Sequence, residues 1–425
     1  MRKFIFFLLI LSAVISFQSC NNNGKKAGET SGFETDEKFQ KEFQEKLILV
    51  EDGGTVEFPE GKFLLKKALS IEGKKNVTIK GAGAGKTILS FLGQTEGAEG
   101  ILVTNCQNIN IENFTIQDAK GDNLKLKGCD GVHIHHMNST WTTGADTSNG
   151  NYGYYPVECR NVLMEYCEVS YCADAGVYIG QSTNVTIHHC YAHHNVAGIE
   201  IENCINSDIY KNKSENNAGG ILVFDLPKLF HGNGRNAKVW DNECIENNFK
   251  NFGKPGSIVA SIPPGSGMII MATDSVDVFN NKIINNKTVG IATVSYYMTG
   301  KQLNDSTYGP YCTSIYIHDN KFERKLSVPD LSTDLGKLLT ATFKGPLDIF
   351  VDGSADPKIR DKDGQLPEGK KICIRNNGDV KFGNLNAWKT HGREDIMNFK
   401  DNDITKFDCS YTGINGNNQK PEEVK

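Results

Sequence analysis

Two glutamates separated by a single residue, Glu200 and Glu202, are the strongest candidates for chemistry in this sequence. Side chains two positions apart on a β-strand point to the same side, about 6.6 Å apart along the strand. Two carboxylates at that spacing repel each other, which favours a shared cation or a raised pKa. Asp225 follows at a turn of the next repeat, and oxygen ligands suit calcium. We therefore expect Glu200, Glu202 and Asp225 to form a metal site, with calcium as the cofactor.

Aromatic and basic residues fall in register with these glutamates when the chain is aligned against itself. The column that contains Glu200 contains Lys125, Tyr155 and Tyr178 in preceding repeats. Tyrosines on neighbouring strands would offer a platform for sugar rings. The alternative is that outward strand positions are polar because they meet water. The expected catalytic residues are Tyr178, Lys125 and Asp174, and the expected substrate-binding residues are Tyr155, Gln181, Asn203 and His231.

A repeat of 22 to 23 residues positions these columns. Gly153, Gly176, Gly198 and Gly220 are 23, 22 and 22 residues apart, and each precedes a strand pattern with apolar residues at alternate positions. A second strand type repeats at the same step, and asparagine-rich turns separate the two. Stacked coils about 4.8 Å apart would bury the inward side chains in one continuous core. The sequence therefore predicts an all-β protein, a parallel β-helix solenoid, which the general rule for parallel crossovers makes right-handed.

The repeat breaks down at both ends of the chain. Phe39, Phe43 and Leu47 recur at every fourth position, so an amphipathic helix over 37–48 is expected to cap the first coil. Regular coils are expected over about 52–325 and an irregular part over 326–425, which together with the helix make one domain, 37–425. Extra residues interrupt the period and are expected to form the walls of a groove. They lie at 142–152, 225–235, 249–265 and 297–311.

The first twenty residues predict where the protein resides. An apolar run over 4–17 follows two basic residues and ends before Ser19-Cys20. A small residue before a cysteine, after an apolar run too short to span a membrane, resembles a bacterial lipoprotein signal peptide. We expect 1–20 to be that signal, Cys20 to carry the lipid and 21–36 to be a flexible tether. No aspartate follows Cys20, so by analogy with a common sorting rule the outer membrane is expected rather than the inner. An ordinary signal peptide is the alternative.

The composition excludes two other classes of protein. The chain has 38% hydrophobic and 23% charged residues and a formal net charge of -5. It is therefore neither disordered nor a nucleic-acid binder that relies on bulk positive charge. We expect a soluble, monomeric body with no nucleic-acid partner.

Twelve cysteines in an exported chain would ordinarily suggest a disulfide framework. The repeat register argues otherwise. Cys106, Cys129, Cys159 and Cys204 fall at one position of successive coils, with Ser182 in the missing place. We expect this column to be an interior ladder of free, buried thiols.

A second cluster of metal-ligating residues is formed by histidines. His135 falls in register with Glu165 and His188, a set that would suit a transition metal. No spacing forces these three side chains onto one point, and the alternative is a solvent-facing row on the second sheet.

The segments Asp-Ala-Gly-Val-Tyr-Ile-Gly-Gln-Ser at 174–182 and Val-Ala-Gly-Ile-Glu-Ile-Glu-Asn at 196–203 carry a resemblance to a known family. From about residue 50 onward the chain resembles exported bacterial right-handed parallel β-helix repeat proteins of the pectin-lyase-like fold. That family has no settled activity and is related to carbohydrate-binding and sugar-hydrolysing domains. The signature motifs of alginate epimerases, polygalacturonases and pectate lyases are absent, so none of their sites is carried over.

These observations together predict a lipid-anchored envelope or surface protein that acts on or binds polysaccharide. If it is an enzyme, a calcium-assisted lyase or epimerase is expected, with proton abstraction beside a carboxylate. The alternatives are a non-catalytic glycan-binding module and a metal-handling accessory protein of the envelope that uses the histidines. A purely structural envelope protein would need none of these sites.

Overall fold

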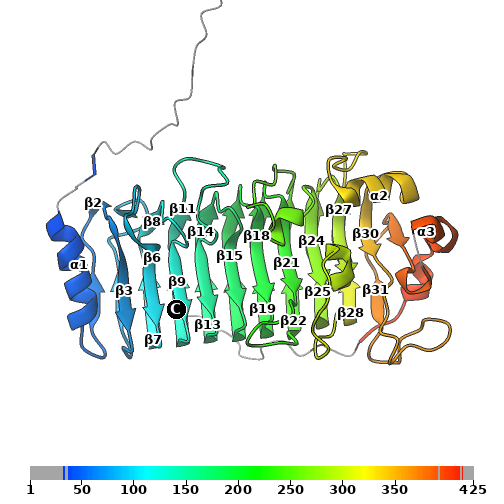
Figure 1. Cartoon of the computed structure of the whole chain (residues 1–425), viewed down its shortest axis with the longest axis horizontal. Coiled ribbons are helices and arrows are strands. Elements are labelled where there is room, and N and C mark those ends of the chain that lie inside the picture. The colour runs from blue at the N-terminus through cyan, green and yellow to red at the C-terminus, as the bar shows by residue number, and fades with distance from the viewer. Residues whose placement is uncertain (1–31, 34–36, 391–392, 412–413, 415–425) are drawn as a thin grey trace, which may run out of the picture.

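Apolar residues at alternate strand positions wind this chain around one long core. The computed structural model describes residues 32–33, 37–390, 393–411 and 414, and in it three parallel sheets run the length of the body (Figure 1). The fold is a right-handed parallel β-helix: the repeat predicts the parallel β-helix, and the rule for parallel crossovers and the family resemblance predict its hand. The predicted signal peptide and Cys20 lie outside the described residues, and so does nearly all of the predicted tether. None of the described helices is long and apolar enough to cross a membrane.

Each coil contributes one strand to each of three sheets, here named I, II and III. Every pairing between neighbouring strands of a sheet is parallel. Sheet I contains β1 (Thr55–Glu57), β4 (Thr78–Lys80), β7 (Gln107–Glu112), β10 (Asp130–His135), β13 (Arg160–Glu165), β16 (Thr183–His188), β19 (Ile205–Tyr210), β22 (Arg235–Trp240), β25 (Asp274–Phe279), β28 (Thr313–His318) and β31 (Ile372–Arg375).

Sheet II is built from strands of three or four residues. It contains β2 (Gly61–Leu64), β5 (Thr87–Ser90), β8 (Thr115–Gln117), β11 (Asn138–Thr140), β14 (Glu168–Ser170), β17 (Tyr191–His193), β20 (Lys213–Glu215), β23 (Glu243–Ile245), β26 (Lys282–Ile284) and β29 (Lys321–Glu323). The sequence predicted only two strand types for each coil. A three-residue strand buries one central side chain, so it has no alternating pattern to detect.

Sheet III carries the candidate site on its outer face. It contains β3 (Lys67–Glu72), β6 (Glu96–Thr104), β9 (Leu124–Lys127), β12 (Tyr154–Val157), β15 (Ala175–Gly180), β18 (Ala197–Glu202), β21 (Gly219–Phe224), β24 (Ser266–Met271), β27 (Val289–Val294), β30 (Leu347–Val351) and β32 (Phe382–Asn384). The regular coils end with β29, close to the predicted limit of 325.

Helix α1 (Glu37–Leu49) closes the N-terminal end, as predicted. Phe43 and Leu47 are fully buried against the first coil. Gln44 accepts a hydrogen bond from the backbone N–H of Ser70 and donates one to its carbonyl, both 2.9 Å long. The helix thereby occupies backbone groups at the open edge of sheet III, which would otherwise invite pairing with another chain.

The C-terminal part folds back over the last coils. It contains α2 (Asp334–Phe343) and α3 (Arg393–Phe399), and short 3-10 helices occur at η1 (Val259–Ser261), η2 (Tyr296–Thr299), η3 (Ala387–Lys389) and η4 (Ile404–Phe407). A disulfide joins Cys373 in β31 to Cys409 beyond η4. This bridge was not predicted, because Cys373 lies outside the predicted cysteine column and Cys409 lies outside the repeated strands.

Ladders of small polar side chains fill the corners between sheets. Between sheets I and II, the Asn242 amide donates to the Asn281 carbonyl oxygen at 3.0 Å and to the Ile209 backbone at 2.9 Å. Buried amides must find such partners, and stacking equivalent asparagines satisfies each from the next coil. The corner between sheet III and the following strand of sheet I holds the cysteine column. Its members Cys106, Cys129, Cys159 and Cys204 are free and buried, as predicted.

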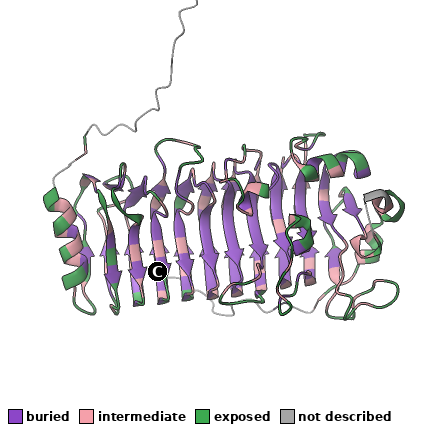
Figure 2. Cartoon of the chain, viewed as in Figure 1, coloured by how far each residue is buried: buried purple, intermediate pink, exposed green. Residues whose placement is uncertain are grey.

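The outer face of sheet III changes character along the solenoid. Up to β18 it carries lysine, tyrosine and glutamate, whereas β21, β24 and β27 present apolar side chains that form a second core with covering loops. Leu222 and Phe224 are buried there beneath the segment 249–265. The outer face of sheet III is therefore polar only in its N-terminal half. Figure 2 shows the sheets buried between exposed loops and helices.

Candidate active site on the outer face of sheet III

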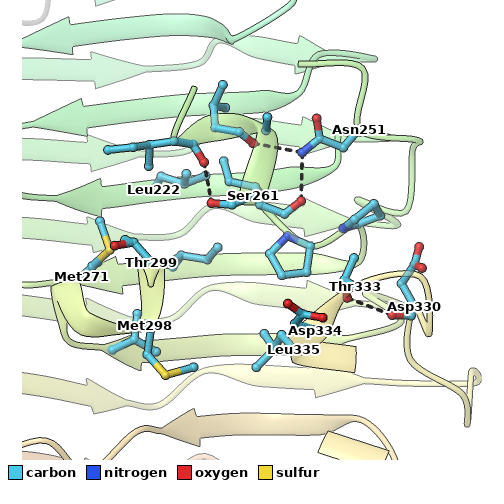
Figure 3. Close-up of a pocket in the computed structure, with 18 of the residues that line it drawn as sticks. Leu222, Asn251, Ser261, Met271, Met298, Thr299, Asp330, Thr333, Asp334 and Leu335 are labelled. Atoms are coloured by element: carbon cyan, nitrogen blue, oxygen red, sulfur yellow. Dashed lines mark hydrogen bonds between the residues drawn. The ribbon is translucent and has the colours of Figure 1, made fainter. Parts of the chain in front are cut away.

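A cleft of about 1300 Å³ opens over sheet III where its polar half meets its apolar half. Tyr152, Asp174, Glu200 and Glu202 line one end of it. The remaining walls come from the segment 248–264, from η2 and from the region of α2, and Figure 3 shows Leu222, Ser261, Met298 and Leu335 around the cavity. The long insertions thus form the walls, as the breaks in the repeat predicted.

Three carboxyl groups meet at this end of the cleft, and two of them are buried. Glu200 and Glu202 project from β18 and are only 3% and 6% exposed, although both are charged residue types. Asp174, which is half-buried, precedes β15. It lies close enough to Glu200 to raise the pKa of that glutamate, and Glu202 in turn raises the pKa of Asp174. Burying charge is costly without a partner. The cluster therefore contains more acid than its surroundings neutralise.

Burial raises the pKa of all three groups. The pKa of Glu200 lies well above its usual range because of burial first, then the neighbouring charges of Asp174 and Glu202. Burial also raises the pKa of Asp174 well above its usual range, and Glu202 adds to this effect. Burial raises the pKa of Glu202 to about 7, against the opposing effect of a hydrogen bond from Tyr178. At neutral pH the cluster therefore holds protons that exposed carboxyls would have lost.

The oxygen atoms of the cluster are not equally satisfied. The Tyr178 hydroxyl donates to Oε1 of Glu202 at 2.8 Å. Tyr152 opposes the larger effect of burial on the pKa of Asp174. Oε2 of Glu200, by contrast, is buried and has no hydrogen-bond partner among the described residues. A buried polar atom left unpaired in this way is a candidate contact for a ligand.

Three tyrosines pack together at the same end. The ring centroids of Tyr152 and Tyr178 are 4.5 Å apart, and those of Tyr152 and Tyr155 are 4.6 Å apart. The predicted residues Tyr155 and Tyr178 therefore pack together, with Tyr152 as a member that the sequence reasoning missed. Their role in binding sugar stays a prediction. Tyr152 directly precedes Gly153, the first glycine of the register, so its position could have been read from the repeat.

Lys125 lies beyond this cluster, toward the N-terminal end. Its Nζ atom is 3.4 Å from Glu99 and 3.8 Å from Asp122, and it sits 4.9 Å from the centre of the Tyr155 ring. Burial raises the pKa of Asp122 to about 6. The structure thus brings Asp174, Tyr155 and Tyr178 together, and it pairs Lys125 with a neighbouring acidic group instead.

Three other predicted site residues hold the loop over 225–234. Both carboxylate oxygens of Asp225 accept the backbone N–H of Gly234, at 2.9 and 2.7 Å. The Asn203 amide donates to the His231 carbonyl at 2.9 Å, and the Gln181 side chain accepts the N–H of Phe230 at 2.8 Å. Asn203 and Gln181 therefore have a structural role here, and His231 lies exposed on that loop.

The metal sites predicted from the sequence are not preassembled. Within the described ranges no three His, Cys, Asp or Glu residues are grouped to hold a metal ion. Asp225 turns its oxygens to Gly234 rather than toward Glu200 and Glu202. Calcium therefore stays a prediction.

The histidine column has the predicted register but not the predicted contacts. His135, Glu165 and His188 are aligned across β10, β13 and β16. Glu165 pairs with His133 at 3.0 Å and with His188 at 3.3 Å, whereas His135 pairs with Glu112 at 3.3 Å. Carboxylates already occupy these ring nitrogens, so the three predicted ligands do not converge.

Comparison with known proteins agrees with the fold. A family model described as a right handed beta helix region matches residues 137–307. Pre-neck appendage proteins of Bacillus phages are similar over shorter stretches: 25% identity over 209 residues for phage B103 and 24% over 291 residues for phage PZA. These alignments cover 41% and 58% of this chain but only 24% and 33% of the phage proteins. The chain thus spans about a quarter to a third of those relatives.

Solved structures with similar folds include two carbohydrate enzymes. The A-module of the mannuronan C-5 epimerase AlgE4 from Azotobacter vinelandii has 13% identity and a TM-score of 0.45, covering 76% of this chain and 86% of the module. The DFA-IIIase from Arthrobacter chlorophenolicus A6 has 11% identity and a TM-score of 0.42, covering 77% of this chain and 90% of the enzyme. Likenesses this distant concern the fold alone.

Proposed function

We propose that this protein is a carbohydrate-active enzyme that binds a glycan in the cleft over sheet III and cleaves a glycosidic bond with the carboxyls of Glu200, Glu202 and Asp174. The single observation that carries the proposal is the unpaired, buried Oε2 atom of Glu200 within a carboxyl cluster that faces the cleft. A cluster of this kind destabilises the fold, and perturbed carboxyls concentrate at functional sites.

Glycosidic cleavage commonly needs one protonated and one ionised carboxyl group. Glu200, whose pKa is raised well above its usual range, supplies the proton to the leaving oxygen. Glu202, with a pKa raised by burial to about 7, is ionised in a substantial fraction of molecules at neutral pH and accepts the proton of the attacking water. The Tyr178 hydroxyl orients Glu202 and stabilises its ionised form.

The lyase or epimerase reaction requires a base that removes a carbon-bound proton. Tyr178 fits that role poorly, because its hydroxyl donates to Glu202 and burial raises its pKa well above the usual range. Lys125 is held by Glu99. An acidic cluster also repels an anionic uronate, so the cleft suits an uncharged glycan better.

A non-catalytic glycan-binding module is the second candidate. It is favoured by Tyr152, which lines the cleft and packs against the rings of Tyr155 and Tyr178, and which offers apolar contact area for a sugar.

The test is to incubate the protein, Glu200→Gln and Glu202→Gln with neutral and uronate oligosaccharides and to identify the products by mass spectrometry. Each assay is repeated with calcium and with a chelator. New reducing ends from a neutral glycan, lost in both variants, support hydrolysis. Unsaturated products from a uronate would support the lyase instead, and binding without any product would support the binding module.

We also propose that the protein is anchored in the cell envelope, in the outer membrane rather than the inner, through lipid on Cys20. The support is the apolar run over 4–17 followed by Ser19-Cys20. Metabolic labelling with an alkyne fatty acid, followed by membrane fractionation, tests this. Label on the wild type and none on Cys20→Ala is expected, whereas a secreted, unlabelled wild type would contradict the anchor.

A further inference from the structure

The cleft has two chemically different halves. Its acidic end carries Tyr152, Asp174, Glu200 and Glu202, and the coils beyond β18 continue the same cavity with aliphatic side chains such as Leu222 and Ile269. From this juxtaposition we infer that the substrate is amphiphilic: an uncharged sugar joined to an alkyl or acyl chain, with the sugar at the carboxyl cluster and the chain along the apolar half. This inference rests on the proposed function and names its substrate class.

Strand register creates the apolar half. Leu222 in β21 follows Glu200 in the column of outward residues, and Ile269 in β24 follows Leu222. In the adjacent column, Met271 and Val294 continue the row after Glu202 and Phe224. The change from acid to aliphatic therefore occurs within one step of the solenoid. A ligand bound along the axis meets both surfaces.

Apolar side chains also gather around the mouth of the cavity. Met298 in η2 is 38% exposed and Met397 in α3 is 52% exposed, and both line the cleft. Leu335 and Leu338 of α2, half-buried, line it too. Three segments that are far apart in the sequence thus place aliphatic groups at one opening. Exposed apolar groups that converge in this way mark a binding surface.

The type of apolar residue favours a chain over further sugar units. Sugar rings bind on the flat faces of aromatic side chains, which lie at the acidic end. On the sheet side the other half is lined by leucine, isoleucine, valine and methionine, with Phe224 among them, while the loops around it add polar side chains such as Asn251 and Thr333. Methionine and branched aliphatic side chains adapt to a flexible hydrocarbon.

The charged residues around the cavity also favour a neutral sugar. Lys287 on the cavity wall is paired with Asp330 at 2.8 Å, which neutralises both. Two further lysines, Lys250 and Lys337, line the cavity, but its five acidic residues outnumber its three lysines, so an anionic headgroup would meet more acid than base. A neutral sugar forms hydrogen bonds without carrying charge, so it can bind beside the carboxyl cluster and beside the Lys287–Asp330 pair.

The experiment measures how affinity depends on chain length. Alkyl glucosides from pentyl to nonyl are titrated calorimetrically, below their micelle concentrations, against Glu200→Gln, so that turnover does not interfere. We expect the dissociation constant to fall about fourfold for each added methylene group. Met298→Asp and Met397→Asp should reduce this dependence. The matched control is Ile359→Asp, which also places a charge at an exposed aliphatic position but outside the cleft.

A dissociation constant that does not change with chain length would overturn the inference, and so would equal effects of Met298→Asp and Ile359→Asp. If the wild type still hydrolysed a plain oligosaccharide in that case, the proposed function would stand without the amphiphilic substrate. If chain-length dependence appeared but the wild type cleaved no alkyl glucoside or oligosaccharide, the apolar half would be supported and the hydrolytic function would fail.

Discussion

The hydroxyl of Tyr178 donates a 2.8 Å hydrogen bond to Oε1 of Glu202, one coil further along sheet III. Both side chains are buried, so water does not compete for this hydrogen bond and the bond is strong. It favours the ionised carboxylate and opposes the effect of burial. The balance leaves the pKa of Glu202 at about 7, near the pH at which an acid–base group is most effective.

Removal of this bond should raise the pKa of Glu202. In Tyr178→Phe the ring remains, but burial is no longer opposed by the hydrogen bond, so Glu202 should hold its proton to a pH above 7. Carbon-13 NMR titration of labelled glutamate carboxyls measures the change. If Glu202 acts as the base, the acidic limb of the pH–activity profile should move upward with it. Tyr155→Phe is the control, because it removes a neighbouring hydroxyl while Tyr178 keeps its bond to Glu202. An unchanged titration in Tyr178→Phe would show that the bond does not set this pKa.

The carboxyl cluster should make the protein less stable as the pH rises. Burial raises the pKa of Glu202 from 4.5 to about 7. Below about pH 4.5 the Glu202 carboxyl is protonated in both the folded and the unfolded chain, so it does not change the free energy of unfolding. As the pH rises toward 7 the unfolded chain ionises first, which favours unfolding, and above 7 the loss levels off. This group alone lowers the free energy of unfolding by about 3 kcal/mol across that window.

Glu202→Gln should therefore unfold at a higher temperature than the wild type at pH 8 and show a smaller change between pH 5 and pH 8. Differential scanning calorimetry at both values makes the comparison. Glu60→Gln, at an exposed position near the N-terminal cap, controls for the loss of one negative charge. If the melting temperatures of the wild type and Glu202→Gln changed equally with pH, burial would not raise the pKa of Glu202.

Much of this architecture could be predicted from the sequence, because it depends on residue patterns that repeat along the chain. The repeat of glycines at 153, 176, 198 and 220, with apolar residues at alternate positions, predicts the coil and the core, and the spacing of Phe39, Phe43 and Leu47 predicts the cap. The glycine register and the spacing of Glu200 and Glu202 placed both glutamates on the outer face. Each of these features depends on local periodicity.

Contacts made by the irregular segments could not be predicted in the same way. The Lys254 ammonium donates to the Asn151 side chain at 2.7 Å across 103 residues, and no pattern links those positions. Asp225 falls in register as predicted. The chain beyond it folds back, however, so that the backbone N–H of Gly234 donates to both carboxylate oxygens of Asp225. Side-chain direction at a turn depends on where a loop ends, which the repeat does not encode.

Lys254 should tie the segment 249–265 across the acidic end of the site. Its charge also lowers the pKa of Asp174 and of Asp122, in both cases against the larger effect of burial. Lys254→Met should release the segment and raise both pKa values. Hydrogen–deuterium exchange should then be faster over 249–262. Lys250→Met, in the same segment, is the control, and equal protection in wild type and Lys254→Met would contradict the tie.

The disulfide between Cys373 and Cys409 should hold the C-terminal cap against the last coils. The two cysteines are 36 residues apart. Closing a loop of that length restricts the unfolded chain and stabilises the folded one by about 4 kcal/mol in the chain-entropy model. Cys373→Ser, Cys409→Ser and the double variant should therefore lower the melting temperature equally. The nine other described cysteines are free and buried, so reductant should destabilise the wild type and leave the double variant unchanged. A wild type that is insensitive to reductant, with melting temperatures unchanged in the variants, would show that the cap is held by packing alone.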